Sequence, residues 1–403
     1  MLPEAKTRSN PSESAPTRPT AAPPSALKER CRRAVASGLF HTGLLSILRK
    51  LEGKRELTEN GGGGLPRLRP SASSKFCILC YHRVGTEGVP FFSRLAPEVF
   101  EAQMQYLRRH YRIVSLSQMC REVKEGSAVP STLAITFDDG YRDLYSHAFP
   151  VLQKYEIPAT IYLIGNCMET GEAPWYDRIF VALGAARTET LELELSEPRT
   201  FVLSDPAARA AAAWEIVCYL RSVPDMRRRE WCASFERQVP VPAAELEGRM
   251  LDWNHVRTMQ RGGVCFGAHT MSHPSVSRLA PSDLREELSG SKKLLENGLQ
   301  VSVEHFAYPF GKPSDCSDAA ENLFSQLGFL SAVTTTAGPN TSGANPFRLC
   351  RMQIGDDRSI PSFAFEVSRM FLSAQVLPQV EVRGTSVTND VLISHENAAI
   401  GKI

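Results

Sequence analysis

Short apolar runs alternate with helix-like segments over about 300 residues of this 403-residue chain, and this alternation restricts the fold more than any other feature. Strands that alternate with helices form a parallel sheet, because each return to the same end of the sheet needs a crossover connection. The length favours a closed or nearly closed β/α barrel over a small open sheet. The strand-like runs are residues 75–84, 133–137, 158–165, 263–269, 304–311, 330–336 and 349–354.

Three parts of the chain depart from this alternation. Residues 170–250 carry helical patterns without clear strands, and we expect them to form a helical insert. Residues 1–73 combine a Pro- and Ser-rich disordered start, a basic amphipathic helix and a Gly-rich linker, and we expect them to precede a barrel domain at 74–372. The tail at 373–403 loses periodicity, which predicts a loosely structured end.

The charge of the chain is balanced overall but uneven along its length. The formal net charge is +2, which argues against a nucleic-acid partner. Residues 1–75, however, hold 14 Lys and Arg against 6 Asp and Glu. The basic helix expected within 27–51 therefore has two open interpretations. It lies on an anionic membrane surface, or it packs on the barrel domain.

Several features predict a cytoplasmic protein. The ten cysteines are scattered, which suits a reducing compartment, and the close pair Cys77 and Cys80 lies in an apolar run typical of a core strand. No apolar stretch approaches the ~20 residues of a membrane span, and the N-terminus lacks a signal-peptide core. We expect a cytoplasmic location, at the inner membrane surface if the basic helix binds lipid.

Polar residues follow the ends of three predicted strands. Asp138 and Asp139 follow the run at 133–137, and His269 follows the apolar residues 263–268. Tyr308 begins a Tyr-Pro-Phe-Gly segment after residues 305–307. In a β/α barrel the carboxyl ends of all strands open onto one face, where catalytic groups gather. These side chains should therefore converge on one site.

The residue types at these strand ends indicate a metal. His269 and His273 are spaced i, i+4, and two imidazoles with one carboxylate form a zinc site that keeps a position open for water. Asp138 and Asp139 would repel each other if both stood free. A cation bound to one of them relieves this repulsion and leaves the other as a base. The pattern predicts a divalent metal, with zinc as the expected ion.

Three motifs resemble those of a known family. The runs TFDDG (136–140), HTMSH (269–273) and YPFG (308–311) look like the first three motifs of the polysaccharide deacetylase family, the NodB-homology domain. The resemblance covers about residues 75–370. It implies a distorted (β/α)7 barrel, within the α/β class, and a hydrolase that uses a divalent metal, usually zinc, to remove N- or O-acetyl groups from sugars.

The resemblance also implies a role for each matched residue. Asp139, His269 and His273 would be the metal ligands, and Asp138 would be the general base. The backbone N–H of Phe310 would stabilise the oxyanion, together with the metal. The substrate-binding residues that we expect around this centre are Tyr141, Trp175, Tyr308, Pro309 and Phe310.

The catalytic acid has two candidates. Many family members carry it as a histidine late in the chain, in a Leu-x-His motif, and the nearest match here is His395. A circularly permuted branch of the family carries it in an early Tyr-His motif, which His82 matches. We favour His82, because it ends a predicted strand whereas His395 lies in the weakly patterned tail.

One position departs from the family pattern. Members often have an arginine two residues before the Pro of the third motif, where it orients the base, and this chain has Ala307. Arg142, Arg348 and Arg351 could each supply a guanidinium, and the sequence does not choose among them.

The resulting hypothesis is a metal-dependent hydrolase that deacetylates an N-acetylated polysaccharide or a lipid-linked sugar. Two alternatives stay open. The barrel could be a glycan-binding module without catalysis, or the same site could hydrolyse an amide that is not part of a sugar, since a fold does not fix a substrate.

Overall fold

The computed structural model describes residues 24–48, 75–86, 94–127, 129–355 and 359–372. The predicted Gly-rich linker and His395 lie outside these residues, as does the predicted tail.

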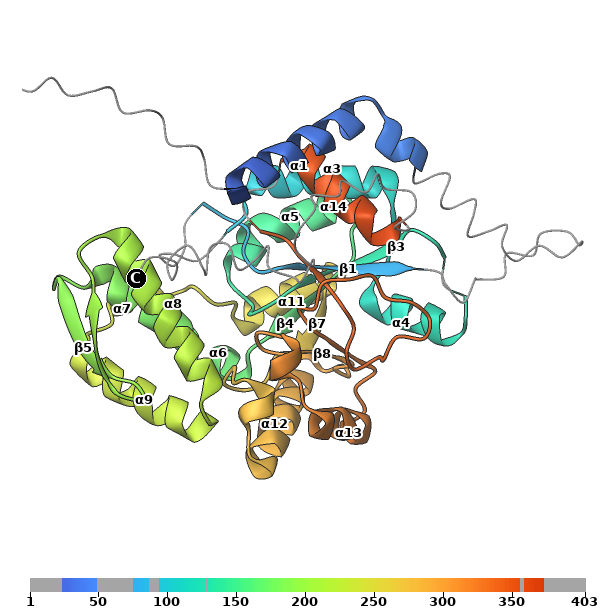
Figure 1. The fold of residues 1–403 in the computed structure, drawn as a ribbon. Coiled ribbons are helices and arrows are strands. Elements are labelled where there is room, and N and C mark those ends of the chain that lie inside the picture. Colours follow the sequence, from blue (N-terminus) through green and yellow to red (C-terminus); the bar gives the residue numbers. More distant parts are fainter. Residues whose placement is uncertain (1–23, 49–74, 87–93, 128, 356–358, 373–403) are drawn as a thin grey trace, which may run out of the picture.

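The centre of the molecule is a curled sheet whose paired strands all run parallel (Figure 1). The order of its main path is β10-β1-β3-β4-β7-β8-β9, and β2 (Arg112–Ile113) pairs beside β3. A parallel bridge between Val333 and Leu349 links the last strand to the segment that leads into β10, so the two ends of the path meet. The predicted β/α barrel is confirmed. Its strands are β1 (Phe76–Tyr81), β3 (Thr132–Phe137), β4 (Ala159–Leu163), β7 (Cys265–Ala268), β8 (His305–Ala307), β9 (Ser331–Val333) and β10 (Met352–Gln353).

Alternate residues of these strands enter two different apolar clusters. Ala134 and Tyr162 belong to a small cluster with Ala307, whereas Ile135 and Ile161 belong to the large cluster under the helices. This separation follows from the two-residue period of a strand, which sends neighbouring side chains to opposite faces of the sheet. Every residue of β1 and β3 is buried, because one face lines the barrel interior and the other is covered by helices.

Helices between the strands cover the outside of the barrel (Figure 1). Local signals fix several of their ends. The helix α3 begins with Pro97 and Glu98 and ends with three basic residues, which suits the helix dipole. A left-handed Gly328 ends α13. The covering helices are α3 (Pro97–His110), the π-helical turn η1 (Leu144–Ala148), α5 (Phe149–Lys154), α11 (Trp253–Arg261), α12 (Pro281–Leu299), α13 (Asp318–Leu327) and α14 (Ile360–Phe371). The helix α4 (Leu116–Lys124) instead packs against the barrel interior, because its buried Leu116 and Met119 belong to the small cluster with Ala307.

The segment between α6 (Gly165–Thr170) and α11 forms a body with its own core, seen beside the barrel in Figure 1. Apolar side chains from three of its helices meet there, including Phe180, Ile216 and Phe235. It is not wholly helical as expected, because residues 190–202 form an antiparallel hairpin. We call this segment the insert; it contains α7 (Trp175–Ala185), β5 (Thr190–Glu194), β6 (Pro198–Val202), α8 (Pro206–Ser222), α9 (Asp225–Gln238) and α10 (Ala243–Leu246).

The basic helix of the N-terminal region, α1 (Pro24–His41), lies along α14 (Figure 1). Arg32 forms an ion pair with Glu366, and Phe40 contacts the ring of Tyr106 at 6.0 Å between centroids. The structure therefore shows α1 packed on the barrel domain, as one of the two interpretations predicted. Contact with a membrane surface stays a prediction. Among the residues that the structure describes, no helix combines the length and the apolar character needed to span a bilayer.

Candidate active site

The strand register brings the first candidate residues together. Tyr81 of β1 pairs with Phe137 of β3, so the residues that follow, His82 and Asp138, lie side by side at the carboxyl ends of neighbouring strands. The backbone N–H of Asp138 continues this pairing by donating to the carbonyl of Tyr81 at 3.0 Å. His269 follows β7 and Tyr308 follows β8 at the same end of the sheet. The predicted convergence on one barrel face is therefore observed.

Asp139, His269 and His273 form a compact buried cluster. Each offers one ligand atom, and these atoms lie within 4.8 Å of one another. The Nε2 atoms of His269 and His273 both lie 3.5 Å from Oδ1 of Asp139. The three side chains are at most 6% exposed, so water does not screen the group. This arrangement concentrates three electron-pair donors around one point.

The surroundings of both imidazoles favour metal binding through Nε2. Nδ1 of His269 lies 2.7 Å from the carbonyl oxygen of Ala307, which can only accept, so Nδ1 carries the proton and Nε2 keeps its lone pair. Burial lowers the pKa of His273 to about 3, so this imidazole is neutral near pH 7. The rings of Tyr176 and Phe310 both lie 4.9 Å from the ring of His273 and fix its position.

The donor set fits a tetrahedral zinc ion. Ligand atoms about 2.1 Å from zinc in a tetrahedron lie about 3.4 Å from one another. The two distances of 3.5 Å to Asp139 agree with this spacing. Two neutral imidazoles and one carboxylate also leave a fourth position for water. Burial raises the pKa of Asp139, but its contacts with His269 and His273 outweigh burial and keep the pKa below its usual value.

Asp138 is held by an arginine that enters the barrel interior. Both of its carboxylate oxygens accept hydrogen bonds from Arg351, at 2.7 Å each, in a two-pronged ion pair. Arg351 is fully buried, and its Nε donates to the carbonyl of Thr334 at 2.8 Å. Burial raises the pKa of Asp138, but the charge and hydrogen bonds of Arg351 outweigh burial, so the pKa lies well below its usual value. Asp138 is therefore ionised.

Arg351 resolves the question that Ala307 raised in the sequence. Ala307 belongs to the apolar cluster of the barrel interior, where its methyl group leaves room, and Arg351 reaches Asp138 from the segment before β10. Arg348 instead pairs with surface carboxylates on α13. Arg142 reaches only the carbonyl of Gly248, at 3.5 Å. Of the three candidates, only Arg351 contacts Asp138.

His82 faces the same carboxylate from the solvent side. Its Nε2 lies 3.9 Å from Oδ2 of Asp138, and its side chain is 28% exposed, so it borders the open side of the site. Sγ of Cys80 lies 3.5 Å from the same oxygen but is fully buried. Cys80, His82 and Asp138 could form a second set of ligands by distance alone. The guanidinium of Arg351 already occupies both oxygens of Asp138, and its charge would repel a cation there.

A comparison of the sequence with models of known families identifies the family of this chain. The model of the family described as polysaccharide deacetylase matches residues 125–331, just over half of the chain. The chain belongs to the polysaccharide deacetylase family. Members of this family are carbohydrate deacetylases, hydrolases that act on carbon–nitrogen bonds other than peptide bonds, and this chain is one of them.

Individual relatives agree with this assignment. YxkH of Bacillus subtilis, a protein named for the same family, is 22% identical over 308 residues, which cover 75% of this chain and 80% of the relative. The poly-beta-1,6-N-acetyl-D-glucosamine N-deacetylase of Staphylococcus epidermidis is 38% identical over 68 residues, which cover 17% of this chain and 24% of that protein. The Streptococcus pyogenes deacetylase PplD, solved in complex with acetate, shares the fold, with 19% identity, a TM-score of 0.51 and coverage of 74% of this chain and 99% of PplD.

The predicted substrate-binding residues of the deacetylase differ in exposure. Phe310 is partly exposed and Trp175 is 9% exposed, and their rings lie 6.2 Å apart beside His273. Tyr141 and Tyr308 have no exposed surface, and Pro309 is also buried. A glycan that arrives from solvent can thus meet Phe310 in this structure, whereas Trp175 is buried in the core of the insert and the two tyrosines do not face solvent.

A buried acid beneath the site had no signal in the sequence beyond its place in the run WYDR. Asp177 on α7 is fully buried, and Oδ1 accepts a hydrogen bond from the hydroxyl of Tyr141 at 3.0 Å. Its Oδ2 is also buried and has no hydrogen-bond partner among the described residues. Burial raises the pKa of Asp177 to about 7. The folded protein therefore keeps a proton on Asp177 at pH values where the unfolded chain has lost it.

This proton makes stability depend on pH in a defined direction. Between the unfolded pKa of 3.8 and the folded pKa of about 7, the folded state binds more protons, so the free energy of unfolding falls as pH rises. We expect Asp177 to account for a loss of about 2–3 kcal/mol between pH 5 and pH 8. Asp177→Asn keeps the acceptor for Tyr141. Urea denaturation at several pH values should show that the variant lacks this part of the pH dependence of the free energy of unfolding. If the free energy of unfolding changes equally with pH in the variant and the wild type, Asp177 is already ionised in the folded protein between about pH 5 and pH 8.

Proposed function

We propose that this chain is a metal-dependent deacetylase that hydrolyses the acetamido group of an N-acetylated polysaccharide or lipid-linked sugar. One observation carries the proposal. A buried carboxylate, Asp138, is ionised and oriented by Arg351 directly beside a second carboxylate that shares a ligand cluster with His269 and His273. A site that only bound a glycan would have no use for a carboxylate oriented in this way.

Each residue of the site has a proposed role that depends on its position. Asp139, His269 and His273 would hold the ion, and a bound zinc ion supplies a water of lowered pKa and polarises the acetyl carbonyl. Asp138 would accept the proton of the attacking water, because its low pKa keeps it ionised and Arg351 fixes its orientation. On the exposed side, His82 would return a proton to the leaving amine. The backbone N–H of Phe310 would donate to the oxyanion, and the partly exposed Phe310 ring would pack against the sugar.

The relatives and the site together support one substrate class. The poly-beta-1,6-N-acetyl-D-glucosamine N-deacetylases of Staphylococcus epidermidis and Escherichia coli act on an N-acetylated glycan by name, and each matches a limited part of this chain. We infer that an N-acetylated sugar is the substrate here as well.

Metal removal tests the proposal directly. We expect the purified protein to release acetate from N-acetylated oligosaccharides, to lose this activity on treatment with a chelator, and to regain it on addition of Zn²⁺. His273→Ala should abolish metal binding and acetate release. His255→Ala is a matched control, because His255 caps α11 through Asp252 and lies outside the ligand cluster.

Two results would contradict the proposal. If fully chelated protein releases acetate at the wild-type rate, the reaction does not need a metal. Glycan binding without acetate release by protein loaded with Zn²⁺ would instead support a binding module on the same barrel.

A further inference from the structure

The loop that carries both candidate histidine ligands has an unfavourable backbone. Thr270 has φ 63° and His273 has φ 56°, so two residues with side chains adopt the left-handed conformation within four positions. Such a conformation is unfavourable for a residue with a side chain and persists only where its surroundings hold it. The 269–273 loop therefore depends on outside contacts to keep both Nε2 atoms directed at Asp139.

One set of contacts holds the carbonyl groups of this loop. At the start of α6, the N–H of Gly165 donates to the carbonyl of Thr270 at 2.9 Å, and the N–H of Asn166 donates to that of Met271 at 2.8 Å. Trp175, on α7 of the insert, donates from its indole nitrogen to the carbonyl of His273 at 3.1 Å. The insert is thus in direct contact with a ligand residue.

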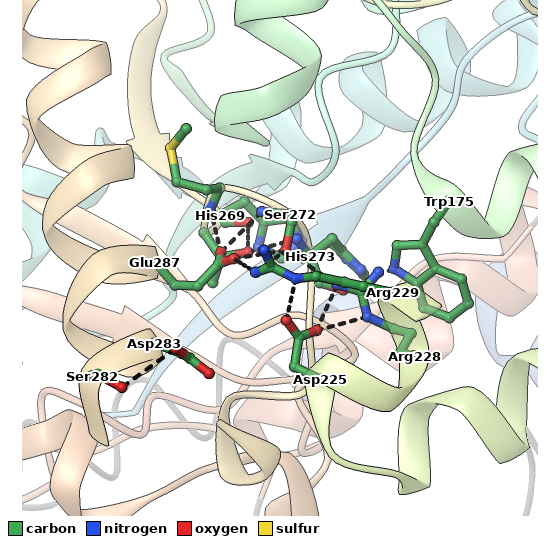
Figure 2. A network of polar contacts seen from close by, with 12 residues as sticks. Trp175, Asp225, Arg228, Arg229, His269, Ser272, His273, Ser282, Asp283 and Glu287 are labelled. Atoms are coloured by element: carbon green, nitrogen blue, oxygen red, sulfur yellow. Dashed lines mark hydrogen bonds and ion pairs between the residues drawn. The ribbon is translucent and has the colours of Figure 1, made fainter. Parts of the chain in front are cut away.

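A single buried carboxylate holds the N–H groups of the same loop. Oε2 of Glu287, on α12, accepts from the backbone N–H groups of Met271 at 2.7 Å and Ser272 at 2.9 Å. Oε1 accepts from the hydroxyl of Ser272 at 2.7 Å (Figure 2). Glu287 is only 3% exposed. A buried carboxylate with three donors from one loop fixes that loop strongly, because hydrogen bonds to a charged acceptor are about twice as strong as neutral ones.

The insert supplies the counter-charge to this carboxylate. Arg229 on α9 donates to Oε1 of Glu287 at 2.9 Å, and Asp225 holds Arg229 in place through a contact of 2.6 Å (Figure 2). Arg228 bonds to the same Asp225 and reaches the hydroxyl of Ser272 at 3.1 Å. Its guanidinium also lies 5.1 Å from the ring of Trp175. These contacts connect two helices of the insert to the ligand loop.

We propose that Glu287, supported by Arg229 of the insert, is a positioning residue that holds the 269–273 loop in its ligand-binding conformation, so that the insert sets the metal affinity of the site. This inference rests on the proposed metal site. Glu287 does not touch the ligand atoms themselves; it acts through the backbone of Met271 and Ser272. Loss of it should therefore weaken metal binding, and not only the stability of the fold.

The test measures metal affinity apart from catalysis. Protein stripped by a chelator is titrated with Co²⁺ in competition with a fluorescent metal indicator, and the midpoint of thermal unfolding of each stripped variant is recorded. We expect Glu287→Gln to bind Co²⁺ about 10–100-fold more weakly than wild type, the usual effect of losing a group that orients ligands. The matched control is Glu286→Gln, because Glu286 is an exposed neighbour on the same helix and should leave Co²⁺ affinity unchanged.

Arg229→Ala gives a second test that does not depend on Glu287→Gln folding well. The Arg229 side chain is 55% exposed, so its removal leaves no buried cavity, yet it should also weaken Co²⁺ binding. Arg227→Ala, which removes an exposed arginine of the same helix, should not. If the support passes through Glu287, the effects of Arg229→Ala and Glu287→Gln on affinity should be non-additive in the double variant.

The outcomes separate this inference from the proposed function. Wild-type affinity for Co²⁺ in both Glu287→Gln and Arg229→Ala would overturn the positioning role while leaving the metal site intact. Lower thermal stability in both variants at unchanged affinity would equally overturn it, because the contacts would then serve the fold alone. A wild-type protein that binds no Co²⁺ would instead overturn the metal site, and the positioning role with it.

Discussion

Replacing Asp138 by asparagine is expected to lower acetate release by about 10²–10⁴-fold, the usual contribution of a positioned general base. The carboxylate is ionised, because Arg351 holds its pKa well below the usual value, and it lies next to the ligand cluster. Asparagine has nearly the same shape but cannot accept a proton. The measurement is the initial rate of acetate release from an N-acetylated oligosaccharide, with zinc content determined on the same sample. We expect zinc content to stay at the wild-type level.

The substitution also weakens an ion pair, so a control must separate lost catalysis from lost stability. Asp143→Asn serves this purpose. Asp143 is a mostly buried partner of Arg83, with a contact of 2.8 Å, and the pair lies outside the proposed catalytic group. This variant should lose stability but keep most of its acetate release. If Asp138→Asn folds, binds zinc and still turns over at the wild-type rate, Asp138 is not the base.

The sequence was sufficient to predict the architecture because the barrel is built by local patterns. Buried parallel strands appear as short apolar runs, and each predicted run overlaps an observed strand, as at Phe76–Tyr81 and Thr132–Phe137. The covering helices at Pro97–His110 and Pro281–Leu299 show clear helical spacing with a proline at the start. The hairpin at residues 190–202 was missed, since its strands are largely exposed and carry little apolar alternation.

The candidate ligand cluster could also be predicted, whereas Glu287 was not foreseen and Arg351 could not be singled out among three candidate arginines. Strand ends converge by topology, so Asp139 and His269 could be placed on one face without knowing any distance. Arg351 is 213 residues away from Asp138 in the sequence, and Glu287 is 16 residues away from Met271. Their side chains look like any other charged residue in the sequence. Only the packing of the barrel interior and of α12 shows which charge is buried against which partner.

Replacing Arg351 by methionine is expected to have the largest effect on stability of any substitution in the site. The change leaves the Asp138 carboxylate at 2% exposure without its two-pronged partner. Breaking a buried ion pair from one side costs about 3–5 kcal/mol, because the remaining charge stays desolvated. Urea denaturation of the variant and the wild type at pH 7 measures this difference. Arg348→Met is the matched control, since Arg348 pairs at the surface, where a salt bridge contributes about 0–1 kcal/mol.

The same substitution should change the pH dependence of catalysis. In the wild type, the charge and hydrogen bonds of Arg351 outweigh burial and depress the pKa of Asp138, so the base stays ionised well below neutral pH. Without Arg351, burial alone acts on the carboxyl, and its pKa must rise. The acid side of the pH profile of kcat/KM should therefore move to higher pH in Arg351→Met, and activity should recover partly as pH increases. Arg351→Lys should shift the profile less, because it keeps a charge but loses the second hydrogen bond. An Arg351→Met variant with the wild-type acid limb would show that another group sets the ionisation of the base.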